Sequence, residues 1–237
     1  MNLEDKIVVI TGGSKGLGKA MALSFLKNGA KVAVCSRDEK RPEDLEENIF
    51  WVKADVTKEE ELKKLADFVV EKFGRLDIWI NNAGILLPRT IAEDFDMEQV
   101  RKMFDVNVFG VINGSRVALR FIKKQGFGSI INIISDSAFV ARPMSSMYAA
   151  SKWAVNGFTK SIREANKNIK IIAEFSPLHL NMLGDSSIDY LNEIKNAGFN
   201  ILDIDDKSEK LEKKDFEQLM RENNIKNERF TDLFLKR

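Results

Sequence analysis

Short apolar runs rich in Val and Ile alternate with longer stretches of helical periodicity over the first 175 residues of the chain. This alternation is typical of βαβ units that build a parallel sheet. Because the runs are apolar at nearly every position, we expect helices on both faces of that sheet. The predicted strands are Ile7–Thr11, Lys31–Cys35, Ile49–Lys53, Asp77–Asn81, Ser129–Ile134 and Ile169–Phe175.

Apolar residues three or four positions apart predict helices between these strands. The first helix ends at Gly29, a glycine suited to a left-handed cap. Thr57 and Glu60 have the spacing of a capping box before a second helix, which ends at Gly74. The apolar face of this second helix consists of Leu62, Leu65, Ala66, Val69 and Phe73.

Two long helices are predicted between residues 97 and 165. Asp96 and Gln99 have the spacing of a helix start and precede a long segment of helical period over 97–124. A further helix is predicted over about 146–165.

The pattern changes from about residue 183 onward. The stretch 203–229 is rich in Lys, Glu, Asp and Asn, and only Phe199–Ile204 has strand character. We therefore interpret 183–237 as an atypical appendage to a core over 5–182, within one domain. An amphipathic helix is the hypothesis for the part that contains Leu211, Phe216, Leu219 and Met220.

The composition of the chain argues against several classes of function. Lys and Arg number 37 and Asp and Glu 36, so the net charge of +1 offers no electrostatic basis for binding nucleic acid. The single cysteine, Cys35, excludes an intrachain disulfide, and the single histidine, His179, excludes a histidine-rich metal site. No apolar run reaches the roughly 20 residues that span a bilayer. Since no signal peptide is recognisable either, we expect a cytoplasmic protein without a metal or membrane partner.

A glycine-rich turn joins the first predicted strand to the first predicted helix. The segment Thr11–Gly18 reads Thr-Gly-Gly-Ser-Lys-Gly-Leu-Gly. Glycine is needed where φ is positive or where the backbone approaches a ligand closely. The helix that follows presents free N–H groups and the positive end of its dipole to a phosphate. In this context the turn predicts dinucleotide binding rather than a simple change of direction. The expected contacts are Gly12, Ser14, Lys15, Gly16, Leu17 and Gly18.

The glycine spacing resembles that of the short-chain dehydrogenase/reductase family. The family's motif Thr-Gly-x-x-x-Gly-x-Gly is matched by Thr11, Gly12, Gly16 and Gly18. The resemblance covers about residues 5–177. It implies a single-domain Rossmann fold, with a doubly wound parallel sheet flanked by helices in three layers, and an oxidoreductase that binds a nicotinamide dinucleotide.

The end of the second predicted strand indicates which dinucleotide is bound. A carboxylate at this place suits the 2′-hydroxyl of NAD(H), but the chain has Ser36 there, followed by Arg37. Arginine makes bidentate contacts with phosphate oxygens, and Lys15 is able to reach the same phosphate from the glycine turn. We therefore expect NADP(H). Asp38 keeps NAD(H) open as the alternative, because it is able to bind a ribose hydroxyl if the loop bends differently.

Other motifs match family residues that line the cofactor. Asp55, before Val56 and Thr57, matches a residue that hydrogen-bonds the adenine, and its other role, a carboxylate beside Thr57 at a helix start, does not exclude this. An Asn-Asn-Ala-Gly motif follows the fourth predicted strand. The cofactor contacts that these motifs imply are Asp55, Val56, Asn82, Ala83, Gly84 and Pro177.

Asn107, Ser135, Tyr148 and Lys152 follow the order of the family's catalytic residues. Tyr148 and Lys152 are four positions apart, so both lie on one face of the predicted helix. A cation beside a phenol lowers its pKa from about 10 toward neutrality. The resemblance implies that Tyr148 is the general acid and base, that Lys152 also holds the nicotinamide ribose, and that Ser135 binds the substrate oxygen. It implies a water held by Asn107.

The segment after the sixth predicted strand departs from the family. Leu178 replaces the usual glycine after Pro177, and Met182 stands where a nicotinamide-binding threonine is expected. The family's last strand, which builds one subunit interface, is not recognisable. The other interface, between the helices at 97–124 and 146–165, predicts a homodimer or a homotetramer.

We expect a reductase or dehydrogenase acting on a carbonyl or alcohol substrate of apolar character. A nucleotide-binding protein without turnover is the first alternative, and a sugar-nucleotide epimerase or dehydratase is the second. The apolar residues near the predicted site, for which core packing is an equally good account, are Leu86, Leu87, Phe139, Met144, Met147 and Met182.

Overall fold

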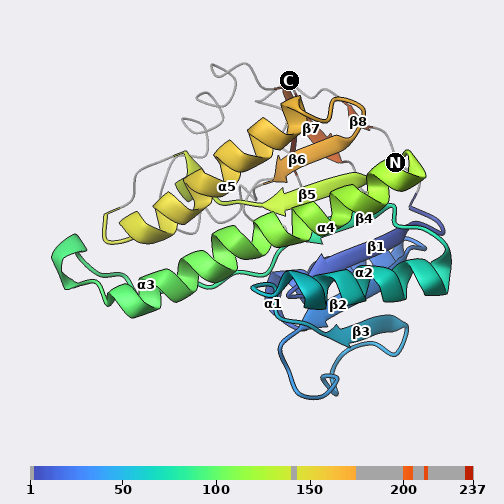
Figure 1. Cartoon of the computed structure of the whole chain (residues 1–237), viewed down its shortest axis with the longest axis horizontal. Helices are drawn as coiled ribbons and strands as arrows, with labels where there is room; N and C mark the ends of the chain where they lie inside the picture. The colour runs from blue at the N-terminus through green and yellow to red at the C-terminus, as the bar shows by residue number, and fades with distance from the viewer. Residues whose placement is uncertain (1–2, 140–142, 175–199, 205–210, 213–232, 237) are drawn as a thin grey trace, which may run out of the picture.

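The computed structural model describes residues 3–139, 143–174, 200–204, 211–212 and 233–236. Its centre is a parallel sheet of six strands in the order β3-β2-β1-β4-β5-β6 (Figure 1). The strands are β1 (Ile7–Thr11), β2 (Lys31–Ser36), β3 (Ile49–Lys53), β4 (Ile78–Asn81), β5 (Ser129–Ile133) and β6 (Lys170–Glu174). The helices are α1 (Gly16–Lys27), α2 (Glu59–Phe73), α3 (Met97–Phe104), α4 (Gly110–Gln125) and α5 (Ser146–Glu164).

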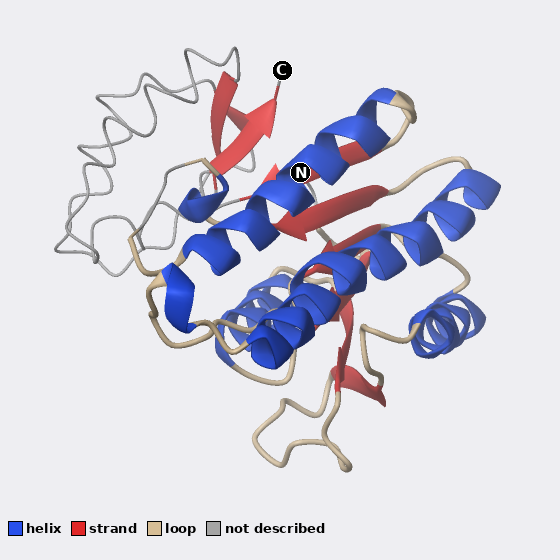
Figure 2. Cartoon of the chain, turned by 60° about the vertical axis from the view of Figure 1, so that its left-hand side comes forward, coloured by secondary structure: helices blue, strands red, loops and turns tan. Residues whose placement is uncertain are grey.

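Helices cover both faces of the sheet. On one face, buried residues of α2 and α4 join a core with Val9, Ala33 and Ile130. On the other face, α1 packs against Val8, Val32 and neighbouring strand residues. Figure 2 shows α4 and α5 running side by side across the strands. This is the predicted doubly wound fold of three layers.

The strand order reverses between β1 and β4. The chain leaves β3, passes through α2 and returns to the other side of β1, where Val8 is in register with Ile78. In open parallel sheets, ligands bind at the carboxyl ends of the strands at such a reversal. The glycine-rich turn after β1 and the Asn82 segment after β4 both lie there.

The ends of the helices follow the predicted signals in most places. Gly29 and Gly74 have φ of 83° and 78°, the left-handed conformation expected at these helix ends. Asp96 caps α3 by accepting hydrogen bonds from the N–H groups of Glu98 (2.9 Å) and Gln99 (3.3 Å).

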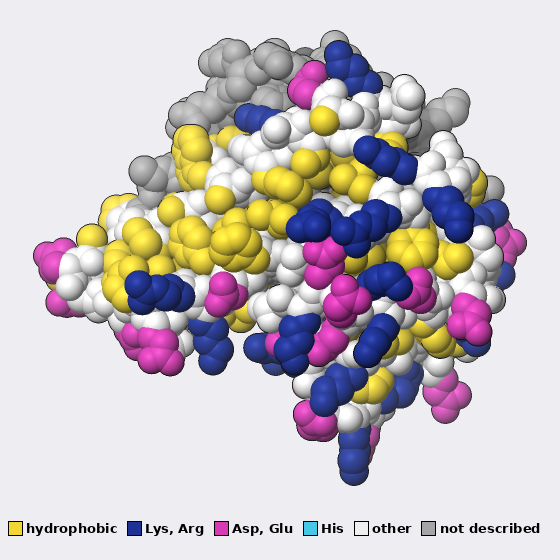
Figure 3. All heavy atoms as spheres, in the orientation of Figure 1, with side chains coloured by type: hydrophobic (Ala, Val, Ile, Leu, Met, Phe, Trp, Pro, Cys, Tyr) yellow, Lys and Arg dark blue, Asp and Glu magenta, His cyan; other side chains and the backbone are white. Residues whose placement is uncertain are grey.

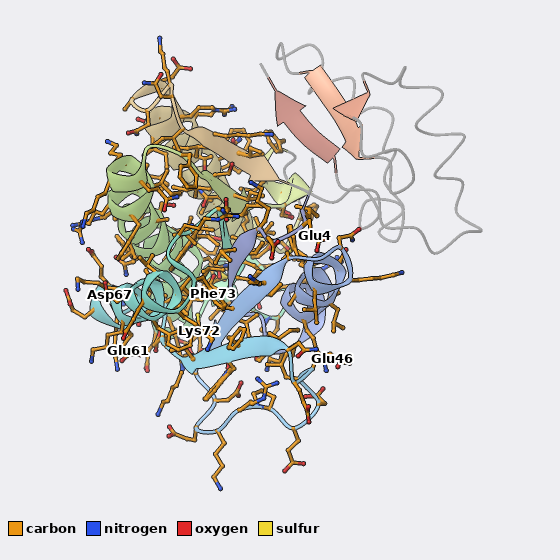
Figure 4. The ribbon with its side chains drawn as sticks, turned by 90° about the vertical axis from the view of Figure 1, so that its right-hand side faces the viewer. Glu4, Glu46, Glu61, Asp67, Lys72 and Phe73 are labelled. Carbon is orange, nitrogen blue, oxygen red and sulfur yellow. The ribbon has the colours of Figure 1, made fainter. Side chains whose placement is uncertain are left out.

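The predicted capping box of the second helix is wrong. Lys58, not Thr57, is the N-cap of α2, and it makes no side-chain cap. Glu61, labelled in Figure 4, accepts a hydrogen bond at 2.8 Å from the backbone N–H of Asp55, which lies three residues before the N-cap. It therefore stabilises the turn before α2 and does not complete a capping box.

The C-terminal end of α2 packs against β3, the edge strand of the sheet. The rings of Phe73 and Phe50 meet edge to face with centroids 5.2 Å apart. The Lys72 ammonium lies 4.6 Å from the centroid of Phe50, and both Lys72 and Phe73 are labelled in Figure 4. These contacts hold β3, which contains Trp51, against α2.

The long predicted helix over 97–124 is interrupted. A π-helical turn, Asp105–Phe109, separates α3 from α4. Such turns add one residue to a helical turn and are frequent at functional sites. Asn107 lies at its centre.

Beyond residue 199, the structure describes three strands in a separate antiparallel sheet of order β8-β7-β9. The predicted strand Phe199–Ile204 corresponds to β7 (Asn200–Ile204). Leu211 lies in β8 (Leu211–Glu212), not in the predicted amphipathic helix. The other residues of that prediction, Phe216, Leu219 and Met220, lie outside the described residues. The remaining strand, β9 (Leu233–Lys236), was not predicted.

Candidate active site

The glycine turn has a backbone that only glycine adopts easily. Gly12 and Gly16 have φ of 65° and 55°. A Cβ on Gly12 would lie 2.9 Å from the Cα of Ala83, and one on Gly18 would collide with the carbonyl oxygen of Gly12. The positive φ angles and the close contacts therefore account for the glycine spacing.

The N-terminal end of α1 faces this turn and fits a phosphate group. Lys15 is the N-cap, its side chain makes no capping hydrogen bond, and the first turn of α1 contains no acidic residue. Free backbone N–H groups at a helix start favour an anion. The predicted dinucleotide is thus compatible with the residues present.

The segment after β4 holds the glycine turn in place. The Thr11 hydroxyl accepts hydrogen bonds from the N–H groups of Asn82 (3.0 Å) and Ala83 (3.1 Å). The Asn82 amide donates to the carbonyls of Thr11 (2.9 Å) and Gly12 (3.2 Å). The structure therefore brings the two predicted cofactor motifs, about 70 residues apart, into direct contact.

A polar cluster forms at the end of β2. The Trp51 indole N–H donates to the Ser36 hydroxyl at 2.7 Å. Hydrogen bonds from the Ser36 and Ser14 hydroxyls, together with the Lys15 charge, hold the pKa of Asp38 below its usual value. Ser14, Lys15 and Ser36, all predicted cofactor contacts, thus influence the Asp38 carboxyl, and Arg37 is exposed.

Asp55 and Val56 have structural roles at the start of α2. The Asp55 carboxylate accepts hydrogen bonds from the backbone N–H and the hydroxyl of Thr57, both at 2.9 Å. The Val56 side chain is buried in the core. Its carbonyl accepts a hydrogen bond from the Asn113 amide at 3.1 Å. The helix-start role of Asp55 is therefore present, and its contact with adenine stays a prediction.

Lys152 is almost fully buried in α5, with 6% of its surface exposed. Its ammonium donates to the carbonyl of Ile133 at 3.0 Å and lies 5.7 Å from the ring centroid of Tyr148. Burial lowers the pKa of Lys152 to about 8. The charge is next to the phenol ring, one helical turn away.

Ser135 follows β5 and lies close to the start of α5. Its hydroxyl accepts a hydrogen bond from the Ser137 N–H at 3.2 Å, and its carbonyl accepts one from Ala138 at 2.8 Å. The short helix that these bonds form, Asp136–Ala138, packs against α5. Ser135 and Tyr148 are both half-buried.

Asn107 connects the site through its side-chain amide. The amide oxygen and nitrogen bond the N–H and the carbonyl of Ile85, each at 2.8 Å. The amide nitrogen also lies 3.4 Å from the Ser151 hydroxyl, which donates to the Tyr148 carbonyl at 2.7 Å. The Asn107 side chain thus links the segment after β4 to α5, and its predicted water stays a prediction.

Sequence reasoning missed three participants, Trp51, Ser151 and Ile85. Ser151 precedes the predicted Lys152, but nothing in its type or spacing marks it. Trp51 lies in a strand that looks like core, and Ile85 acts through its backbone. Only tertiary contacts identify them.

Two loops that carry predicted apolar residues meet at the site. The Thr90 N–H donates to the carbonyl of Met144 at 3.0 Å, which joins the loop after β4 to the loop before α5. Leu86 is 66% exposed and Met144 is 48% exposed. Leu87, Phe139 and Met147 are half-buried. The predicted residues Pro177, Leu178, His179 and Met182 lie outside the described residues.

The structure also bears on the single cysteine and on the expected absence of a membrane span. Burial raises the pKa of Cys35 to about 12, so the thiol is inert apolar filling at neutral pH. Within the part of the chain that the structure describes, every helix is too short or too polar to cross a bilayer.

The sheet order, the glycine turn at the strand reversal and the buried Lys152 beside Tyr148 define a nucleotide-binding protein of the Rossmann type. The family model described as short chain dehydrogenase matches residues 6–175. This chain therefore belongs to the short-chain dehydrogenase family.

Relatives with and without a named substrate are similar to the chain. Uncharacterized oxidoreductase YxnA of Bacillus subtilis is 33% identical over 195 residues, which cover 79% of this chain and 53% of YxnA. (+)-Borneol dehydrogenase 2 of Salvia officinalis is 36% identical over 169 residues, 68% of this chain and 60% of the relative. The chain thus spans little more than half the length of these two proteins.

Two solved structures share the fold. ElxO with NADP bound is 38% identical with a TM-score of 0.66, over 71% of this chain and 72% of ElxO. The 3-ketoacyl-(acyl-carrier-protein) reductase from Brucella melitensis, complexed with NADH, is 32% identical with a TM-score of 0.68. The match covers 72% of this chain and 75% of the reductase.

Proposed function

We propose that this chain is an NADP(H)-dependent oxidoreductase that acts on a carbonyl or alcohol group. The observation that carries the proposal is the buried Lys152 ammonium, 5.7 Å from the ring centroid of Tyr148 at the carboxyl edge of the sheet. A buried charge is costly, and its position beside a phenol gives it a chemical purpose.

Tyr148, Lys152 and Ser135 carry out the proton transfer of the proposed reaction. A bound nicotinamide supplies or accepts the hydride. Below a pH of about 8, Lys152 is charged and favours the phenolate form of Tyr148. In reduction the Tyr148 hydroxyl gives its proton to the substrate oxygen, and in oxidation the Tyr148 phenolate takes the proton of the substrate hydroxyl. The Ser135 hydroxyl donates a hydrogen bond to that oxygen as its negative charge grows.

The proposed cofactor is NADP(H), although one structural relative was solved with NADP and another with NADH. The start of α1 binds the pyrophosphate, and Lys15 and Arg37 bind the 2′-phosphate. Asn82 and Ala83 support the turn through Thr11. Asp55, Val56, Gly84 and Pro177 complete the proposed set of cofactor contacts.

The proposed substrate has an apolar body. Leu86 and Met144 expose apolar surface on loops joined by the Thr90–Met144 hydrogen bond. One relative is named for borneol, and a structural relative for a ketoacyl group on a carrier protein. Terpenoid ketones and oxoacyl thioesters are therefore the first classes to assay.

Tyr148→Phe tests the function. We expect the purified protein to oxidise NADPH faster than NADH with a ketone, an aldehyde or an oxoacyl thioester, followed by absorbance. The variant should lose turnover by roughly 10²-fold or more, the usual contribution of a general acid. NADPH binding by calorimetry should stay within about twofold, since the ring is retained.

Three results would contradict parts of this proposal. Normal turnover by Tyr148→Phe would rule out its proton-transfer role. Nucleotide binding without turnover on any substrate of the panel would favour a binding protein. Faster oxidation of NADH would refute the cofactor preference.

A further inference from the structure

Trp51 holds the Ser36 hydroxyl in one orientation. Ser36 ends β2, and its partner in register on β3 is Lys53, two residues beyond Trp51. The indole reaches along the sheet and donates to the Ser36 Oγ at 2.7 Å. An indole N–H only donates, so Ser36 is the acceptor of this bond.

The accepted bond leaves the Ser36 proton available for another group. A hydroxyl has one donor and two acceptor positions. Hydrogen bonding from the Ser36 and Ser14 hydroxyls, together with the Lys15 charge, lowers the pKa of the nearby Asp38 carboxyl.

These donors come from the two elements that enclose the ribose end of the predicted cofactor. Ser14 and Lys15 belong to the glycine turn, and Ser36 belongs to the end of β2. Asp38 is exposed, so a ligand reaches it from solvent. The chain's own carboxylate thus lies where an external phosphate would find the same donors.

We propose that Trp51 is a positioning residue for cofactor choice: its indole keeps the Ser36 hydroxyl directed as a donor toward the 2′-phosphate of NADP(H). The inference rests on the proposed use of NADP(H). It adds Trp51 to the residues that determine the preference.

The two nucleotides differ in how much they need an oriented donor. A 2′-phosphate only accepts hydrogen bonds at its charged oxygens, and bonds to charged groups are the stronger ones. A 2′-hydroxyl both donates and accepts, so it pairs with Ser36 in either orientation. Loss of the indole N–H should therefore weaken NADPH selectively.

Trp51→Phe tests this role because it removes the N–H and keeps an aromatic ring. Dissociation constants for NADPH and NADH are measured by calorimetry on the wild type, Trp51→Phe, Ser36→Ala and the double variant. We expect Trp51→Phe to weaken NADPH roughly tenfold and NADH by less than about twofold, the scale of one hydrogen bond to a charged group. The double variant should bind NADPH no more weakly than Ser36→Ala, since both changes remove one interaction.

Trp153→Phe is the matched control, because Trp153 is an exposed tryptophan on α5, away from the glycine turn. It should leave both constants unchanged. If Trp51→Phe does not fold, Trp51→Leu, which also removes the indole N–H, carries the test. Equal weakening of both nucleotides, or additive effects in the double variant, would show a merely structural role and overturn the inference.

Two results distinguish a failure of the proposed cofactor from a failure of the role of Trp51. A wild type that prefers NADH overturns the cofactor proposal and the inference with it. A wild type that prefers NADPH, with the same ratio of constants in Trp51→Phe, overturns the inference alone.

Asp38→Asn tests whether the exposed carboxylate two residues after Ser36 opposes the 2′-phosphate. Removing the carboxylate charge should tighten NADPH binding by roughly three- to tenfold, because the 2′-phosphate no longer competes with an anion for the same donors. NADH binding should stay within about twofold, since the 2′-hydroxyl carries no charge. Unchanged or weaker NADPH binding in this variant would refute the role of Asp38.

Discussion

Lys152 combines a charge with nearly complete burial. Its ammonium has the Ile133 carbonyl as a partner at 3.0 Å, and only 6% of the residue is exposed. Burial disfavours the charged form and lowers the pKa of Lys152 from 10.5 to about 8. The residue that favours the phenolate of Tyr148 therefore destabilises the folded chain.

Lys152→Met should make the protein more stable and inactive. The folded state binds fewer protons than the unfolded state between pH 8 and 10.5, so wild-type stability rises with pH across that window. Below pH 8 the penalty is full, and each unit of pKa shift corresponds to about 1.4 kcal/mol. The methionine variant should exceed the wild type by roughly 1–3 kcal/mol at pH 7.

Urea unfolding at pH 7 and at pH 10 measures this difference. The advantage of Lys152→Met should shrink at pH 10, where most of the wild-type penalty is gone. A wild type that is the more stable protein at pH 7 would mean that the Ile133 hydrogen bond outweighs desolvation.

At the scale of elements, a buried chain of hydrogen bonds joins β4, β5, α4 and α5. The Asn81 amide donates to Ser115 (3.1 Å) and Asn132 (2.8 Å), and the Asn132 amide donates to Thr159 (2.8 Å). The Thr159 hydroxyl donates to the carbonyl of Val155 in the preceding turn of α5 at 2.7 Å. All four polar side chains are at most 2% exposed. They fix α5, and with it Tyr148 and Lys152, on the sheet.

Thr159→Val should destabilise the fold by about 1–3 kcal/mol, because it leaves the buried Asn132 amide without its acceptor. The shape of the side chain is nearly unchanged, so packing contributes little. Thr159→Ser is the matched control, since it keeps the hydroxyl and should lose much less than the valine variant. Urea unfolding of both variants measures these losses, and equal losses would show that the buried hydroxyl contributes no more to stability than the methyl group.

At the scale of the whole molecule, an apolar face runs along α4 and α5. Figure 3 shows apolar side chains gathered over these helices. Phe109, just before α4, and Trp153 on α5 are each 54% exposed. The nearby Arg116 and Arg120 pair with Glu59 of the same chain. We propose a second copy of this chain as its partner, in the predicted homodimer.

Trp153→Glu should convert the dimer to a monomer, because two-fold symmetry places the charge twice in one apolar interface. Light scattering after size exclusion measures the mass. Phe127→Glu is the control, since Phe127 is 49% exposed just beyond the far end of α4. A wild-type monomer, or a Trp153→Glu dimer, would refute this interface.

The pattern of apolar and polar residues in the sequence was sufficient to predict the main strands and helices and to place the motifs on them. The observed β1 and β3 match their predicted bounds, and β4 and β5 differ by one residue at one end. Tyr148 and Lys152 meet because four residues make about one helical turn. Gly12 and Gly16 were recognisable because a positive φ favours glycine at that position, whatever the rest of the fold does. Each of these features depends only on residues within a few positions of one another, so the sequence alone was enough to predict it.

The contacts between elements depended on the tertiary structure. Asn107 bonds Ile85 across 22 positions, and Asn82 reaches Thr11 across 71, only because the sheet order places their elements side by side. The pKa of Lys152 depends on burial, which no motif encodes. The bond from Trp51 to Ser36 requires the register of β2 against β3. A long-range contact forms only when the fold places two elements beside each other. The hydrophobic period of one element carries no information about where the other element lies.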